Sequence, residues 1–216
     1  MVQSSCRAFF ATLVSVGGLT GTLSAQTTFD VGPMVGNYRP FGTFAPASIY
    51  LTSLPAKPSD LGGLAWGGTA RIGFRPRFGA ELQASATNST IPAVITPGGM
   101  RGPTHAQVVV VTVQGQYDVS PAAERYRVWV GAGPAFIRHG GDAYSPVGSP
   151  RSLGAALGVG VDTRIIRMLR MAAGVTAMAY TFDVTMPAEF KLNPGSLQHG
   201  NRVDALVYIG ARWSRP

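Results

Sequence analysis

The sequence predicts an all-β fold, an eight-stranded antiparallel up-and-down barrel that crosses a membrane. Eight segments alternate apolar residues with small or polar ones, as strands with two different faces do. The connections between these segments alternate between short and long, which is typical of transmembrane barrels. Charged residues make up 13% of the 216 residues, against about 25% in ordinary soluble domains.

The amino terminus has the pattern of a secretory signal peptide. Arg7 supplies a positive charge, a run of uncharged and mostly apolar residues follows, and the small residue Ala25 closes the segment. The run is shorter than the roughly 20 apolar residues of a membrane-spanning helix. We therefore expect residues 1–25 to be a signal peptide and residues 26–216 to form one barrel domain. Cys6, the single cysteine, would be removed with the signal, which excludes cysteine chemistry from the mature protein.

Each predicted strand is close to the roughly 9–11 residues that a tilted strand needs to cross a bilayer. The first is the least regular, because Gly32 and Pro33 interrupt it, and the last alternates most cleanly. The eight segments are residues 29–38, 64–74, 78–86, 107–117, 126–136, 153–162, 169–182 and 202–213.

One face of each strand is apolar and should meet lipid, whereas the other carries Gly, Thr, Gln and isolated charges and should line the interior. Aromatic residues near the strand ends should form the girdles at the membrane interfaces: Trp66, Phe74, Phe78, Tyr117, Tyr126, Phe182 and Trp213. Unpaired charges inside are costly, so the interior charges should pair. By alternation these are Arg71, Glu81, Arg127, Asp162, Arg170, Arg202, Asp204, Arg212 and Arg75.

The hairpin of the second and third strands should turn at Pro76. If Phe74 pairs with Phe78, then Arg71 lies opposite Glu81 on the interior face. Side chains that face each other in this way have roots about 4.5–5.5 Å apart. A guanidinium and a carboxylate at that separation can form a bidentate ion pair.

The long connections, residues 39–63, 87–106, 137–152 and 183–201, are rich in Gly, Pro and Ser. Short turns should lie on the same side of the membrane as the two chain ends. We therefore expect the chain ends in the periplasm and the long connections outside the cell.

Two other classes of protein share some of these features. A soluble, secreted, lipocalin-like binding barrel also has eight strands, but its polar face points outward into water. Here the more polar face consists largely of Gly, Thr and Gln, which would make a poor water-facing surface. Nucleic-acid binding is suggested by the net charge of +8. The arginines are nevertheless scattered singly, and a secreted protein leaves the cytoplasm, so no nucleic-acid partner is expected.

The mature chain resembles the small outer-membrane β-barrel families typified by OmpX, the OmpA barrel and the opacity proteins. The resemblance rests on the topology, the alternation and the amphipathic last strand, in which Val203, Val207, Ile209 and Trp213 share a face. It implies location in a bacterial outer membrane, contact with its lipid, and recognition of the last strand by the outer-membrane assembly machinery. It also implies envelope structure, adhesion or binding of an extracellular partner through the long loops.

A search for catalytic groups finds no site. The histidines should be solvated loop residues. None of them has the His-x-Ser-Asn pattern of outer-membrane lipid A deacylases. A lipid-modifying enzyme is the alternative function. No catalytic, metal or cofactor site is expected, and the protein should not be an enzyme. The candidate residues for catalysis are His105, His139, His199, Asp142, Ser145, Ser149 and Ser196. The glycines of residues 131–133 and 158–160 lack a nucleotide-loop context and should make room for a bulky interior neighbour such as Trp129.

Overall fold

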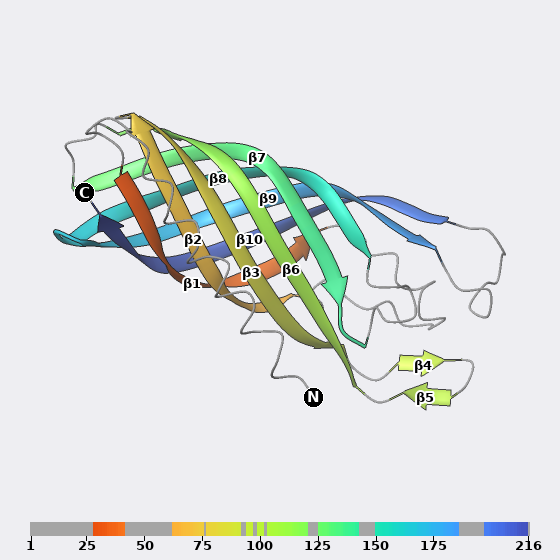
Figure 1. Ribbon diagram of the computed structural model, residues 1–216. Helices are drawn as coiled ribbons and strands as arrows, with labels where there is room; N and C mark the ends of the chain where they lie inside the picture. Colours follow the sequence, from red (N-terminus) through yellow and green to blue (C-terminus); the bar gives the residue numbers. More distant parts are fainter. Residues whose placement is uncertain are drawn as a thin grey trace.

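Eight long strands close into one antiparallel barrel in the computed structural model (Figure 1), which confirms the predicted fold. The structure describes residues 28–41, 62–75, 77–91, 94–96, 99–101, 103–120, 125–142, 150–185 and 197–215. The predicted signal peptide lies outside them and stays a prediction. The barrel strands are β1 (Thr28–Phe41), β2 (Gly63–Arg75), β3 (Phe78–Ile91), β6 (Thr104–Asp118), β7 (Tyr126–Gly140), β8 (Arg151–Ile166), β9 (Leu169–Thr185) and β10 (Leu197–Arg215).

The strands follow one another round the barrel in the order β1-β10-β9-β8-β7-β6-β3-β2, so the first and last strands pair and close the wall. Two short strands, β4 (Val94–Thr96) and β5 (Gly99–Arg101), pair as a separate hairpin between β3 and β6. This hairpin projects beyond one end of the barrel in Figure 1. Within the described residues, no helix is long and apolar enough to cross a membrane.

The strands run further than predicted at the end of the barrel that bears the long connections, called the outer end below. For example, β3 continues to Ile91 and pairs with β6 as far as Thr104. Backbone pairing does not require apolar side chains, so the hydrogen-bonded pairing of the strands continues past the region whose outward side chains are apolar. The sequence there, Asn88-Ser89-Thr90, lacks the apolar alternation by which a strand is recognised.

Apolar side chains cover the outer face of the barrel and form its apolar belt, whereas the interior combines charged and polar side chains with a cluster of buried apolar ones, among them Ile137 and Leu206. On β10, Val207 is 51% exposed and the neighbouring Tyr208 is 2% exposed, and the same alternation continues along the strand. Leu153, on β8, is 77% exposed. A soluble lipocalin-like barrel would turn a polar face outward, so this exposed apolar face agrees with a wall that faces lipid.

A girdle of exposed aromatic side chains surrounds the inner end, where the short turns lie. Phe78 and Tyr117 contact each other edge to face, with 5.3 Å between ring centroids, and Phe74, Tyr126 and Trp213 are also exposed. Phe182 was wrongly predicted to belong to a girdle. It is buried inside the barrel, because its position in the alternation of β9 is an inward one.

The predicted register of the β2–β3 hairpin is confirmed over most of its length. Arg71 is paired with Glu81, and the pairing continues regularly to Gly73. The pairing of Phe74 with Phe78 is wrong, because a bulge after Gly73 shifts the register and sets Arg75 opposite Phe78. A bulge adds one residue to a strand and bends it, and such a local change leaves the pairs beyond it intact. Pro76 lies outside the described residues.

Candidate functional site

Buried charges gather inside the inner half of the barrel, and we call them the lumen network. In the described part of the chain the network contains three guanidinium groups and four carboxylates, all on inward-facing positions. Its members are Arg71, Arg127, Arg212, Asp30, Glu81, Asp118 and Asp162. Because charge of both signs is present, the groups offset one another's cost of burial.

Arg71 binds mainly to β6 rather than to the opposite residue on β3. Its Nη2 lies 2.9 Å from Oδ2 of Asp118, and its Nε donates to Oε1 of Gln116 at 2.7 Å. Gln116 Nε2 in turn donates to Oε2 of Glu81 at 2.9 Å. The direct ion pair predicted between Arg71 and Glu81 is therefore wrong, although the two residues are opposite each other and are joined through Gln116.

The partner of Glu81 is Arg212, from the last strand. Arg212 Nη2 lies 2.9 Å from Glu81 Oε2, and its Nε donates to Thr69 Oγ1 at 3.1 Å. Arg212 Nη1 is also 3.5 Å from Asp162 Oδ2. Strands β10 and β3 are separated by β1 and β2 in the wall, so this ion pair reaches across the interior.

Arg127 connects opposite sides of the barrel. It binds Asp162 on the neighbouring strand β8. Its Nη2 lies 3.8 Å from Oδ2 of Asp30, and its Nε lies 3.9 Å from Oδ1 of Asp118. Asp30 is on β1, four strands away from β7 in either direction round the wall. The lumen network therefore spans the full width of the interior.

The middle of the barrel is filled by a second bridge between opposite strands. Thr176 Oγ1 on β9 donates to Gln83 Oε1 on β3 at 3.2 Å, and β9 and β3 are also four strands apart. Gln83 Nε2 lies 3.3 Å from the sulfur of Met34. An eight-stranded barrel is just wide enough for side chains to fill it, and these contacts fill this one.

Trp129 is the largest fully buried side chain of the described residues, and it lies in the lumen at 1% exposure. Glycines on the neighbouring strand β8 make room for it, as the sequence predicted. A Cβ atom on Gly160 would come within 2.5 Å of the indole ring, and one on Gly158 within 3.0 Å. The two glycines therefore serve packing of the indole rather than nucleotide binding.

A cluster of polar and aromatic side chains lies in the outer half of the lumen. Asp204 accepts hydrogen bonds from the hydroxyl groups of Tyr38 and Tyr180, the latter at 2.6 Å. The Tyr180 hydroxyl also lies 3.4 Å from Nε2 of His139, and the His139 ring contacts Phe182 edge to face. The cluster joins β1, β7, β9 and β10 near the outer mouth.

Three inward-facing residues were missed by the sequence analysis. Asp30 lies before the interruption at Gly32, and Asp118 and His139 were assigned to connections. Strict alternation could have found the last two, since Asp118 follows Gln116 in the pattern of β6 and His139 follows Trp129 in that of β7. His139 is therefore a buried lumen residue and not the solvated loop residue that we expected.

The expected interior charges are buried with three exceptions: Arg127 and Arg170 are half-buried on inward-facing positions, and the placement of the Arg75 side chain stays a prediction. The candidate residues for catalysis are dispersed. His105 is exposed on β6, Asp142 is exposed after β7, and His199 lies in β10. The candidate serines, Ser145, Ser149 and Ser196, are outside the described residues.

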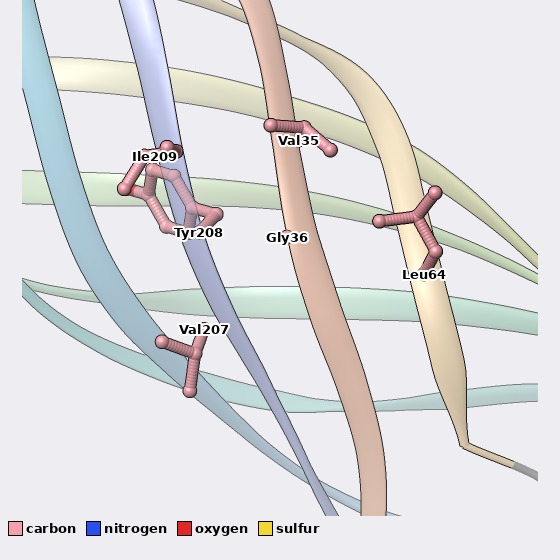
Figure 2. Close-up of a pocket in the computed structure, with 6 residues that line it drawn as sticks. All are labelled: Val35, Gly36, Leu64, Val207, Tyr208 and Ile209. Carbon is pink, nitrogen blue, oxygen red and sulfur yellow. The ribbon is translucent and has the colours of Figure 1, made fainter.

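The outer wall carries a shallow apolar hollow of about 250 Å³ where β10, β1 and β2 run side by side (Figure 2). Val35, Leu64, Val207 and Ile209 border it, and Gly36 forms part of its floor. Gly36 has no side chain to fill the space, and a Cβ there would come within 2.3 Å of the Val207 carbonyl oxygen. The hollow opens on the apolar outer face of the barrel.

The sequence matches no protein-family model and no curated protein, whereas the structure is similar to several solved barrels. OprG of Pseudomonas aeruginosa is 15% identical, with 87% of this chain and 95% of that chain covered and a TM-score of 0.56. Neisserial surface protein A is 13% identical, with coverages of 86% and 96% and a TM-score of 0.52. This chain has the fold of a small outer-membrane barrel.

The outer membrane protein W of E. coli has the same fold, with 23% identity, coverages of 86% and 96% and a TM-score of 0.51. This likeness agrees with the resemblance inferred from the sequence. At these identities it establishes the architecture, and the role of the chain has to be argued from its own residues.

Proposed function

We propose that this chain is a bacterial outer-membrane protein whose barrel is a closed anchor rather than a pore. Its long outer connections contact the exterior of the cell, in envelope structure, adhesion or binding of an extracellular partner. The observation that carries the proposal is the lumen network, because Arg127 reaches Asp30 on the opposite wall. A barrel that is closed inside can act on its surroundings only through its outer surfaces.

The proposed location rests on the exposed apolar belt and on the fold, which is that of outer-membrane proteins. The belt would contact membrane lipid. The outer-membrane assembly machinery would recognise the last strand, which carries Val207, Ile209 and Trp213 on its outward face. No nucleic-acid partner is proposed.

We propose that the role involves no catalysis. His139, the histidine in the outer cluster, is buried in the lumen and faces Tyr180 rather than the lipid. A lipid-modifying enzyme would need its reactive groups where an acyl chain or a headgroup can reach them. His105 is exposed on the outside of β6, opposite Thr90 of β3, but among the described residues no hydrogen bond joins it to a nucleophilic hydroxyl group.

The closed lumen can be tested by recording ion conductance in planar bilayers. The native barrel should conduct far less than a general porin reconstituted in the same way. Arg127→Ser removes one bridge across the lumen and should raise the conductance. Arg125→Ser, at an exposed position in the neighbouring turn, is the matched control and should leave it unchanged. A steady conductance of the native protein equal to that of the porin would contradict the proposal.

A further inference from the structure

Two arginines face each other on the outside of the barrel at its outer end. Arg138 on β7 and Arg151 on β8 are direct partners across the two strands, and both side chains are exposed. Within the described part of the chain, neither has a recorded hydrogen bond or ion pair. They therefore differ from the arginines of the lumen network, each of which contacts at least two carboxylates.

Like charges in this position repel each other. Directly opposed residues have their Cβ atoms about 4.5–5.5 Å apart, and two positive charges there destabilise the pairing. An anion held between the two guanidinium groups removes that penalty. The planar guanidinium fork also matches phosphate oxygens, which it binds in bidentate fashion.

The arginine pair lies just above the apolar belt. Strand β7 starts at Tyr126 in the inner girdle, and Arg138 follows twelve residues later. With a rise of about 3.3 Å per residue and a tilt of about 45°, that corresponds to about 28 Å across the membrane. The apolar band of such barrels is about 25 Å tall. The guanidinium groups therefore lie at the depth of the outer headgroups.

Apolar side chains lie beside and beneath the pair. Val109 is opposite Arg138 on the other side of β7, and Leu153 follows Arg151 on the outward face of β8. A ligand that meets both the arginines and these side chains needs an anionic head and hydrocarbon chains. A free phosphate would meet only the arginines.

We propose that Arg138 and Arg151 hold a phosphate group of a lipopolysaccharide-type glycolipid in the outer leaflet, whose acyl chains lie along Val109 and Leu153. This proposal rests on the proposed location and orientation of the barrel. It identifies a lipid partner and the surface of the barrel that would recognise it.

The test compares binding of lipid A carrying both its phosphates with binding of dephosphorylated lipid A, by native mass spectrometry of the folded barrel. The native protein should bind the phosphorylated form at least ten-fold more tightly. Arg138→Gln with Arg151→Gln should remove that preference. The matched control is Arg164→Gln with Arg167→Gln, two exposed arginines at the inner end, which should retain it.

Thermal unfolding supplies a second readout, because the effect of Arg151→Gln on the unfolding temperature should reverse when phosphorylated lipid A is added. Without lipid A, in a zwitterionic detergent, Arg151→Gln should raise the unfolding temperature because it removes the repulsion. With phosphorylated lipid A the same variant should unfold at a lower temperature than the native protein.

Equal binding of the two forms of lipid A, an equal loss in the control variant, or displacement by inorganic phosphate at millimolar concentration would overturn the proposal. Migration of the unheated barrel on a gel reports membrane-type folding separately from lipid recognition.

Discussion

Replacing Arg212 with methionine should lower the free energy of unfolding by about 3–5 kcal/mol, the usual cost of breaking a buried ion pair by removing one partner. The change leaves the buried carboxylate of Glu81 without its cation and removes the hydrogen bond to Thr69. It also takes a positive charge away from Asp162, 3.5 Å distant. Urea unfolding of the barrel in lipid vesicles would measure the loss.

A double-mutant cycle separates the two arginines near Glu81. Arg212→Met combined with Glu81→Gln should cost clearly less than the sum of the single changes, because the two groups bind each other directly. Arg71→Met combined with Glu81→Gln should come closer to additivity, because Gln116 lies between them. The reverse ranking would show that the partners in the lumen are assigned wrongly.

Trp129→Ala should destabilise the barrel by about 3–5 kcal/mol, as expected when a buried tryptophan is truncated to alanine. The indole is 1% exposed, and the glycines at positions 158 and 160 beside it have no side chains that could fill the space. The loss should appear in equilibrium unfolding of the protein in vesicles.

The matched control is Trp213→Ala, which removes the same side chain from a position that is 53% exposed on the outer wall. Lipid can fill the space left there, so the cost should be clearly smaller. If both changes cost the same, Trp129 does not fill the lumen in the way described.

The inside and outside faces could be predicted from the sequence because a strand has a period of two. On β10 the alternation of Val207 and Tyr208 already separates lipid-facing from lumen-facing residues, and a slip of one residue would exchange the two faces of the whole strand. The same argument located most of the buried charges. Phe182 was assigned wrongly because its position near the strand end favours a girdle, whereas alternation places it inside the barrel.

The choice of partners within the lumen could not be predicted. Alternation shows that Arg71 points inward, but a long arginine side chain in a narrow interior can reach carboxylates on several strands. The partner is Asp118 on β6, two strands away, and that choice depends on the tilt and stagger of the closed barrel. The bulge after Gly73 is another local feature that periodicity does not reveal.

The most direct test of the whole account is the stability of Val207→Arg in lipid bilayers. Val207 is 51% exposed on the apolar face of β10, and an arginine near the middle of the membrane on that face should cost about 2–4 kcal/mol. Val207→Leu is the control and should fold as well as the native protein. Unchanged stability of Val207→Arg would mean that this face does not meet hydrocarbon, which would contradict the account of a membrane-spanning barrel.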